Sequence, residues 1–493
     1  MKKTGNKTRA IWSFSLYGGW LLALLFQGPV LFELLGDNLS DSRVFPMGLI
    51  AAHASGLILS GFVTKSLTQA KVTLILATLV SFLGSAFFYT PYNPLWGGVM
   101  MTLGFSSGLY IGSWAFYLKV LFQAKDRFRA VAEILIYSNF LLMLLSVLTM
   151  TLGPAIGLGT AMMLPVLSLA ALLRINFGEF IEPEMEGISL EVLLKHQKKS
   201  FKPLVLLGAF ILMITINSGI MYEVVAPAFG HLPGISSYYF VLPYILAIFL
   251  VQRLPRGKPR AYTLYIGLSL LGLSYILFIL MDRSIPAYLW INGLMLGALG
   301  IFDLFWWSIL AGFFDYYKNP AKIFGIGLGI NVTGITIGGM VGAELYGIGQ
   351  STVVSLVALG LLFVVVMILP VLNEQLIFVL GSHGFLYPVP VLGEERRKSM
   401  GMEPLTGKES LKEERENENG GEPGEVEGMP SDDILTPREQ EISELLVMGY
   451  TYKAVANELY LSENTVKYHV KNIYGKFGVR TKMEFIRKKS CQN

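Results

Sequence analysis

The residues of this sequence that are best suited to chemistry lie near its C-terminal end, in the segment LSENTVKYHVKNIYGKF, residues 461–477. Apolar residues there recur at the spacing of one helix face and predict a buried stripe made of Val466, Val470, Ile473 and Phe477. The polar residues on the outward face of that helix are Asn464, Lys467, Tyr468 and Lys471. Lysine can donate to guanine O6 and N7, and asparagine can pair with adenine, so this face has the chemistry to read bases in the DNA major groove.

Two further residues lie where they can hold the DNA backbone. Thr465 and Lys453 are each near a predicted helix start, a position better suited to phosphate contacts than to base contacts. Residues 436–493 contain ten Lys and Arg against six Glu, which gives a net charge of +4. This balance favours the DNA backbone and predicts an affinity that falls as the salt concentration rises, because binding releases counterions from the DNA.

Short helices with clear start signals must position these residues. A threonine N-cap, a proline at the first helical position and a glutamate that closes a capping box follow one another at Thr436, Pro437 and Glu439. The expected helices are 437–448, 452–459, one that begins after Ser462 and one that begins near Lys482. This order predicts a four-helix domain built around a helix-turn-helix.

The segment from Leu435 to Phe485 resembles the C-terminal DNA-binding domain of LuxR-type bacterial transcription regulators. Five motifs carry the resemblance: L-T-x-R-E-x-E, G-x-T, V-A-x-E-L, S-x-x-T-V-K-x-H-V-x-N-I and K-F-G-V-R. The resemblance implies that the third helix reads DNA, with base contacts from Lys467, Tyr468 and Lys471 and phosphate contacts from Thr465 and Lys453. It also implies a homodimer formed through the fourth helix, residues 482–489. The alternative is a basic helical tail that binds acidic lipid or protein.

The rest of the sequence has the composition of a membrane protein. Of all 493 residues, 53% are hydrophobic and 15% charged, and the mean hydropathy of +0.54 is too high for an ordinary soluble protein of this length. Twelve apolar stretches can each cross a bilayer core of about 30 Å. They lie near residues 11–35, 44–64, 72–90, 95–118, 130–152, 154–173, 203–226, 236–252, 261–281, 286–311, 323–346 and 351–372. The expected fold class is therefore all-α: a polytopic bundle of twelve transmembrane helices, six and six, with a C-terminal four-helix helix-turn-helix domain.

The charges in the connecting loops predict how the bundle is oriented. If the N-terminus is inside, the internal segments carry 21 Lys and Arg, whereas the external loops carry only Arg43 and Arg283. Lysine and arginine resist translocation, so this asymmetry places both termini in the cytoplasm. The expected location is the plasma membrane, with lipids around a multi-pass bundle.

After the last apolar stretch the composition changes to that of a tether. Residues 394–433 are charged, rich in Gly and Pro and nearly without aliphatic side chains, so they cannot bury enough surface to fold alone. We expect a membrane domain at 1–372, a juxtamembrane segment and linker at 373–433, and a DNA-binding domain at 434–493. The segments QGPVLFE (27–33) and NSGIMYE (217–223) suggest that the two halves of the membrane domain are repeats, with chance similarity as the alternative.

Two groups of six spans with both termini inside resemble the major facilitator superfamily. The loop Gly61 to Lys65 keeps the glycine and the basic residue usual between spans 2 and 3 of that family, but it lacks the aspartate. Polar groups inside a bilayer need a partner, a cavity or a function. The candidates for holding a ligand are Glu33, Glu223, Gln27, Asn217, His53 and Asp303, and the alternative for each is wetting at the interface or a hydrogen bond between helices. Trp306 and Trp307 are expected to serve packing or interface anchoring.

Together these features predict a membrane-bound one-component transcription regulator. An unidentified small molecule would bind the transporter-like bundle, and the cytoplasmic domain would bind double-stranded promoter DNA. The alternative is an active secondary transporter with a regulatory DNA-binding tail. No nucleophile–base pair or phosphate loop with supporting context is present, and Cys491 is the single cysteine, so we expect no enzyme, cofactor or metal site.

Overall fold

The structure is a computed structural model with two compact units, Met1–Pro388 and Val389–Asn493, and each is described by itself. It describes residues 2–26, 28–36, 44–177, 190–232, 234–235, 239, 241–254, 261–347, 351–380, 435–447, 452, 455–456, 459, 463–479, 484–485 and 489.

The first unit is built from helices alone in the part of the chain that is described. Its first half contains α1 (Lys2–Trp20), α2 (Pro29–Leu35), α3 (Val44–Val63), α4 (Leu67–Ala86), α5 (Leu95–Leu121), α6 (Ala124–Leu152) and α7 (Pro154–Leu173). Its second half contains α8 (Leu190–Ile220), α10 (Leu242–Arg253), α11 (Ala261–Leu280), α12 (Ile285–Gly312), α13 (Pro320–Gly347) and α14 (Ser351–Leu380). The helical fold class is thus confirmed.

Each of the twelve predicted spans overlaps one of these helices. Nine helices among the described residues are long and apolar enough to cross a membrane. The second and eighth spans correspond to the shorter apolar helices Gly48–Val63 and Leu242–Arg253. The fourth corresponds to α5, which has 27 residues but carries several glycines and serines. The chain is a membrane protein, and the number of crossings stays a prediction.

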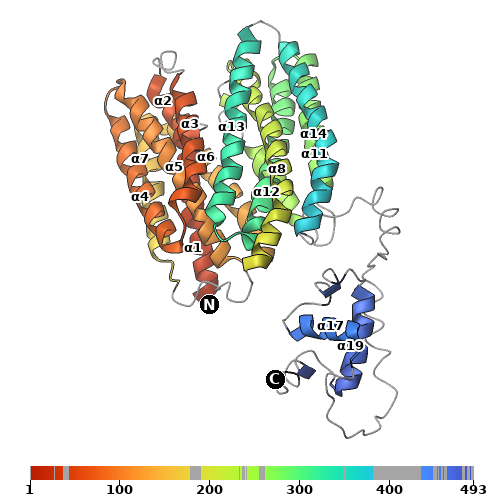
Figure 1. Ribbon diagram of the computed structural model, residues 1–493. Helices are drawn as coiled ribbons and strands as arrows, with labels where there is room; N and C mark the ends of the chain where they lie inside the picture. The colour runs from red at the N-terminus through yellow and green to blue at the C-terminus, as the bar shows by residue number, and fades with distance from the viewer. Residues whose placement is uncertain are drawn as a thin grey trace. The chain divides into compact units, whose positions relative to one another are not determined.

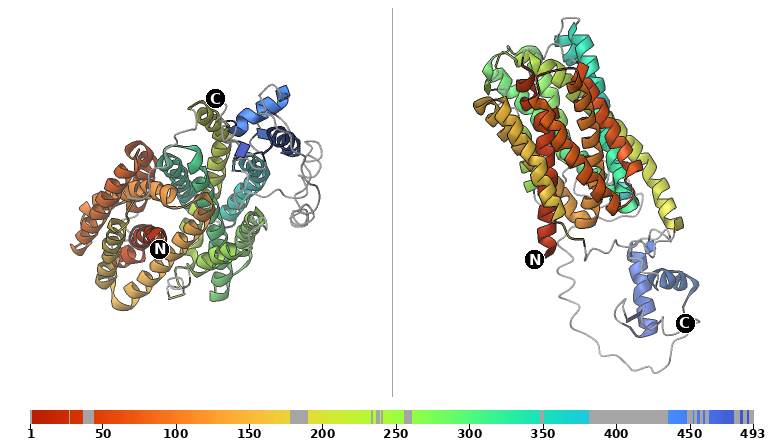
Figure 2. Two further views of the ribbon diagram at one scale, coloured as in Figure 1. Left: turned by 90° about the horizontal axis from the view of Figure 1, so that it is seen from below. Right: turned by 90° about the vertical axis from the view of Figure 1, so that its left-hand side faces the viewer.

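The two halves of the first unit repeat one packing pattern. In the first half α1 packs against α6 and α7, and in the second half α8 packs against α13 and α14. The pair α3 and α5 has its counterpart in α10 and α12, and the pair α4 and α7 in α11 and α14. Between the halves, α3 packs against α13 and α6 against α10. Figure 1 shows the two groups side by side, and the view from below in Figure 2 separates the red-to-yellow helices from the green-to-cyan ones.

Glycines allow the closest of these helix contacts. A methyl group added at Gly108 of α5 would lie 2.3 Å from the carbonyl oxygen of His53 in α3, so only glycine fits there. Glycines of α13 also allow close approach to neighbouring helices. A methyl group at Gly325 would lie 2.2 Å from the carbonyl oxygen of Leu57 in α3, and one at Gly338 would lie 2.0 Å from that of Ile216 in α8. One helix therefore bridges the two halves.

The first helix of each half changes to a π-helical turn and then meets a proline. α1 continues as η1 (Leu21–Phe26) before Pro29, and α8 continues as η4 (Met221–Val225) before Pro227, which begins the short η5 (Pro227–Phe229). These matching breaks align Pro29 with Pro227. This alignment differs from the register that lays residues 27–33 on residues 217–223.

Helix ends in this unit follow local signals, with one departure from the sequence prediction. Gly153, with φ of 94°, ends α6, and Pro154 occupies the first position of α7. α14 contains Pro370 but continues to Leu380, eight residues beyond the end that the sequence predicts for the membrane domain. Leu372 and Leu376 of that last stretch are fully buried, which explains why the helix continues.

The second unit contains α17 (Pro437–Val447) and α19 (Glu463–Phe477), the first and third of the four predicted helices. The predicted second and fourth helices fall mostly outside the described residues. The helices pack around a small apolar core made of Leu435, Ile442, Leu446, Val455, Ala456, Val466, Val470, Ile473, Phe477 and Phe485.

Candidate DNA-binding interface and membrane ligand site

Helix α19 has one buried face and one exposed face, as its sequence predicts. The apolar stripe is enclosed, with Val466 and Ile473 at 0% exposure. On the opposite face Lys467, Tyr468 and Lys471 are exposed, and Tyr468 has 64% of its surface accessible although it is large and aromatic. An exposed aromatic residue between two lysines is well suited to a groove lined with bases and phosphates.

The remaining predicted DNA contacts are placed in part. Thr465 is half-buried near the start of α19. Asn464 lies in α19, but its side chain is outside the described residues, as is the whole of Lys453. The structure therefore brings three of the six predicted residues onto one exposed face, and the DNA contacts of all six stay predictions.

A capping box fixes the start of α17, in the form that the sequence predicts. The Thr436 backbone N–H donates to Glu439 Oε2 at 2.9 Å, and the Glu439 backbone N–H donates to Thr436 Oγ1 at 3.3 Å. Glu439 also accepts a hydrogen bond from Lys476 Nζ at 2.6 Å and is only 3% exposed. This carboxylate thus connects the start of α17 to the last turn of α19, a contact that the sequence did not indicate.

Replacing Glu439 with alanine should destabilise the DNA-binding domain by about 2–3 kcal/mol, because the change removes a helix cap and the buried carboxylate that accepts a hydrogen bond from Lys476. Burial alone would raise the pKa of Glu439, but the hydrogen bonds from Lys476 and Thr436 outweigh it and hold the pKa below the ordinary value of 4.5. A lowered pKa means that this stabilisation is present above pH 4.5 and is lost as the pH falls through the folded-state pKa.

Urea denaturation of a fragment comprising residues 431–493, followed by circular dichroism, measures the loss of stability in Glu439→Ala. Repeating the measurement at several pH values shows whether the difference disappears at low pH. Glu441→Ala is the matched control, since Glu441 is exposed and pairs with Arg438 on the surface of α17. It should cost less than about 0.5 kcal/mol. Equal losses for the two variants would contradict the assigned role of Glu439.

Two further contacts hold α19 in place, and a third fixes the chain just before it. Arg438 of α17 donates to the carbonyl oxygen of Leu459 at 2.6 Å, ahead of the start of α19. The hydroxyls of Tyr452 and Tyr474 lie 3.1 Å apart. Phe485 packs edge-on against Phe477, with ring centroids 5.1 Å apart. The helix is thus fixed along its length, so its exposed face has a defined direction for docking.

The predicted ligand residues near the outer ends of spans 1 and 7 are not gathered into one cluster by described contacts. Glu33 of α2 and Glu223 of η4 are both exposed. Glu223 lies beside α13, since a methyl group at Gly342 would be 3.2 Å from Glu223 Cβ. Asn217 is fully buried in α8 and donates to the Met213 carbonyl oxygen at 3.3 Å. Gln27 lies outside the described residues.

The other two predicted ligand residues have contrasting surroundings. His53 of α3 is 3% exposed, and its Nδ1 lies 2.8 Å from Ser107 Oγ of α5, so its polar contacts are with a neighbouring helix. Asp303 of α12 is half-buried, and its Oδ2 accepts a hydrogen bond from the Tyr244 hydroxyl at 2.7 Å. Asp303 is thus the more accessible of the two, and ligand contact by either stays a prediction.

Polar contacts join the two halves at the end of the bundle where α1 begins. Arg127 of α6 forms a two-pronged ion pair with Asp315, with Nη1–Oδ2 at 2.9 Å and Nη2–Oδ1 at 2.7 Å. Lys119 donates to the Tyr317 carbonyl oxygen at 2.8 Å. Asn319 donates to the carbonyl oxygens of Gly61 and Thr64 at 2.7 and 3.0 Å. We call these contacts the inter-half latch. The pattern of loop charges did not indicate this pairing.

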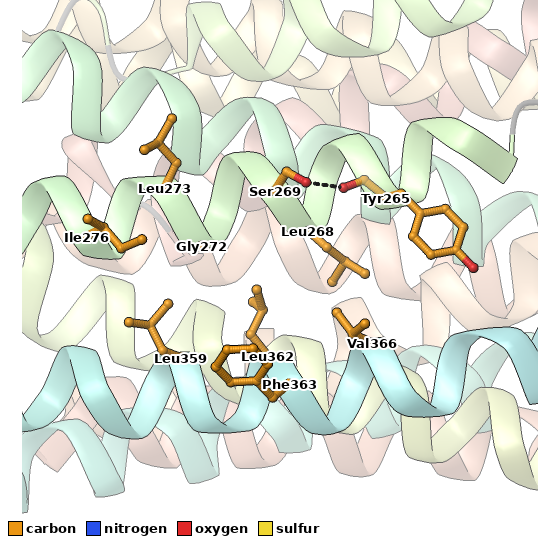
Figure 3. Close-up of a pocket in the computed structure, with 10 residues that line it drawn as sticks. All are labelled: Tyr265, Leu268, Ser269, Gly272, Leu273, Ile276, Leu359, Leu362, Phe363 and Val366. Carbon is orange, nitrogen blue, oxygen red and sulfur yellow. Dashed lines mark hydrogen bonds between the residues drawn. The ribbon is translucent and has the colours of Figure 1, made fainter.

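A groove on the outer surface of the second half is separate from these residues. It lies between α11 and α14, with a volume of about 430 Å³, and Figure 3 shows its mostly apolar lining. The lining residues are Tyr265, Leu268, Ser269, Gly272, Leu273, Ile276, Leu359, Leu362, Phe363 and Val366. Ser269 donates to the Tyr265 carbonyl oxygen, so its hydroxyl is already satisfied. The groove contains none of the predicted ligand residues and has the character of a surface covered by lipid.

Comparison with known proteins places the second unit in a family. Residues 433–488 match the family model of bacterial regulatory proteins, luxR family. The spore germination protein GerE of Bacillus subtilis is 43% identical over 53 residues, which are 11% of this chain and 72% of that protein. The transcriptional regulatory protein DegU of Brevibacillus brevis is 42% identical over 53 residues, and the probable regulator SgaR of Hyphomicrobium methylovorum is 49% identical over 45. The chain spans only about a fifth of the length of these last two.

The first unit is similar in fold to solved transporters. The human organic anion transporter MFSD10 (TETRAN) superposes with a TM-score of 0.58 and 16% identity, covering 74% of this chain and 99% of that one. The nucleoside transporter NupG superposes with a TM-score of 0.52 and 15% identity, covering 76% of this chain and 100% of that one. These identities establish the fold alone. Through its C-terminal domain the chain belongs to the luxR family of bacterial regulatory proteins, and that DNA-binding domain is fused to a membrane bundle with the major facilitator fold.

Proposed function

We propose that this protein is a membrane-bound transcription regulator that senses a small molecule through its transporter-like bundle. Binding of the solute shifts the conformational populations of the bundle, and the attached helix-turn-helix domain gains or loses its ability to occupy promoter DNA. In this proposal twelve crossings place both termini in the cytoplasm, and two DNA-binding domains form a dimer on the DNA.

The observation that carries the proposal is the exposed face of α19. Lys467, Tyr468 and Lys471 stand on a helix whose other face is fully packed, in a domain of a family of DNA-binding regulators. Side chains on the N-terminal half of such a helix reach base edges when the helix enters the major groove. A DNA-binding output on the same chain as a membrane bundle supports signalling from the membrane to the chromosome.

The inter-half latch supports the bundle as the input. The latch is an ion pair with hydrogen bonds at one end of the contact between the two halves, and such bonds can break and form again when halves move as rigid bodies. A solute shifts such an equilibrium only if it binds one state more tightly than the other. The ligand must therefore contact residues whose surroundings differ between the latched and unlatched states.

A second function, secondary transport with a regulatory tail, is favoured by the fold of the bundle. Two halves with repeated packing and a breakable contact at one end are the parts that a transporter needs to expose a central site to alternate sides. In that case solute flux, and not promoter occupancy, would be the main output.

One paired experiment separates the two functions. Promoter occupancy by the full chain is mapped by chromatin immunoprecipitation in cells given a panel of solutes, and uptake of each solute is measured in liposomes that contain the purified protein. A sensor changes occupancy with at least one solute and transports it no faster than empty liposomes. Rapid uptake without any change in occupancy would replace the sensor with the transporter.

A further inference from the structure

We propose that Asp303 is the anionic anchor of a binding site for organic cations, such as substituted ammonium compounds, inside the bundle. This inference rests on the proposed sensing function and names the chemical class of its ligand.

The position of Asp303 makes its charge costly. It lies nine residues before Gly312, the end of α12, and therefore about 14 Å along the helix from that end. That depth is inside the hydrocarbon core, where a charged side chain costs roughly 2.5–3.5 kcal/mol unless a partner or water compensates it. A carboxylate at this depth needs a positive partner, and intramembrane carboxylates of this kind usually mark a functional site.

The described surroundings supply a hydrogen bond but no positive charge. The hydroxyl of Tyr244 in α10 donates to Asp303 Oδ2 at 2.7 Å, and Tyr244 is 8% exposed. Among the described residues no Lys, Arg or His forms an ion pair with Asp303. A methyl group at Gly300 would lie 2.7 Å from the Tyr244 carbonyl oxygen, so α10 and α12 approach closely and hold the tyrosine beside the carboxylate. The acceptor is thus fixed in place and partly accessible, and among the described residues no cation is paired with it.

Trp307, one helical turn from Asp303, belongs to a cluster of aromatic rings from four helices. Trp307 follows Asp303 by four residues, so the two share a face of α12. Trp307 packs edge-on against Phe14 of α1 at 5.9 Å and Phe324 of α13 at 5.2 Å, and Phe14 packs against Trp114 of α5 at 4.5 Å. This cluster joins the two halves, so the shared face of α12 is directed toward the first half. Trp307 thus serves helix packing, one of the two roles that its sequence position predicts.

A fixed carboxylate beside aromatic faces selects for cations. An organic cation gains both the Coulombic attraction of the carboxylate and the interaction of a positive charge with aromatic π-systems. An anion would be repelled by Asp303, and a neutral polyol would leave the carboxylate charge uncompensated. Because Trp307 contacts helices of both halves, a ligand here would also favour one arrangement of the halves over another.

The test compares a cation with its neutral isostere on the full chain in lipid nanodiscs. Choline and benzyltrimethylammonium are titrated, with 3,3-dimethylbutan-1-ol as the uncharged shape match of choline, and binding is followed by thermal stability and tryptophan fluorescence. We expect saturable binding of at least one of the cations and none of the alcohol. This comparison needs no variant, so it is decisive even if changes at Asp303 impair folding.

Variants then locate the site. Asp303→Asn should weaken cation binding by about 30-fold or more, because it removes the charge and preserves the shape. Glu133→Gln, which removes a carboxylate paired with Arg129 at the edge of α6, is the matched control and should bind as the unaltered protein does. Equal binding of choline and the alcohol, no binding of either cation, or full binding by Asp303→Asn would overturn the assignment.

The failures of this site and of the proposed sensor are distinguishable. If a cation binds through Asp303 but leaves the DNA affinity of the full chain unchanged, the site stands and the sensor proposal fails. If no cation binds while another solute alters DNA affinity, the sensor stands and the cation site is wrong.

Discussion

Replacing Lys467 and Lys471 together with alanine should lower the affinity of the protein for its promoter DNA by about 100- to 1,000-fold, since each lost base contact costs about 1–3 kcal/mol. Both side chains are exposed on one face of α19, while the opposite face is packed into the core of the domain. The change therefore removes DNA contacts without removing core contacts. Gel-shift titration of the full chain in nanodiscs measures the loss.

Two controls make that result specific. Gln440→Ala alters an exposed residue of α17 and should leave the affinity within about twofold, as surface substitutions usually do. The double variant should lose less affinity for scrambled DNA of equal length than for promoter DNA, because it lacks base contacts that only the promoter sequence provides. An unchanged affinity in the double variant would show that α19 does not read the DNA through this face.

Replacing Asp315 with asparagine should open the latched end of the bundle. Arg127 has only 5% of its side chain exposed, so the change leaves a nearly buried guanidinium without its countercharge. Breaking a fully buried pair costs about 3–5 kcal/mol; because Asp315 is 49% exposed, we expect about 2 kcal/mol here. That free energy corresponds to a shift of about 30-fold toward the unlatched state.

The shift can be measured by thiol labelling at the contact between the halves. Ser60 of α3 is fully buried, and its hydroxyl lies 3.4 Å from the Ala321 carbonyl oxygen in α13. In a Cys491→Ser background, Ser60→Cys should react with a maleimide about 30-fold faster when Asp315→Asn is added, since labelling follows the open population. Glu133→Gln breaks the exposed pair with Arg129 and should leave the rate unchanged. If Asp315→Asn leaves the labelling rate of Ser60→Cys unchanged, the ion pair does not hold the two halves together.

The features that depend on residues close together in the sequence were predicted correctly. The capping box of Thr436 and Glu439 and the buried stripe of α19 have the predicted form, because both depend on residues three or four positions apart. Helix positions in the bundle followed from apolar run length, which the bilayer sets.

Contacts between distant residues were not predictable in the same way. Arg127 and Asp315 are 188 residues apart, and the loop charges counted Arg127 only as a sign of orientation. The central position of Trp307 depends on the partners Phe14 and Phe324 from other helices. The π-helical turns that break α1 and α8 at corresponding places likewise became visible only in the fold.

The DNA-binding domain can act only if it lies on the same side of the membrane as the chromosome. The single native cysteine, Cys491, allows a direct test without any substitution. Protoplasts are treated with a membrane-impermeant maleimide before and after permeabilisation, and labelling of the full chain is compared. The account predicts labelling only after permeabilisation. Labelling of Cys491 in intact protoplasts would place the domain outside the cell and contradict a role in transcription.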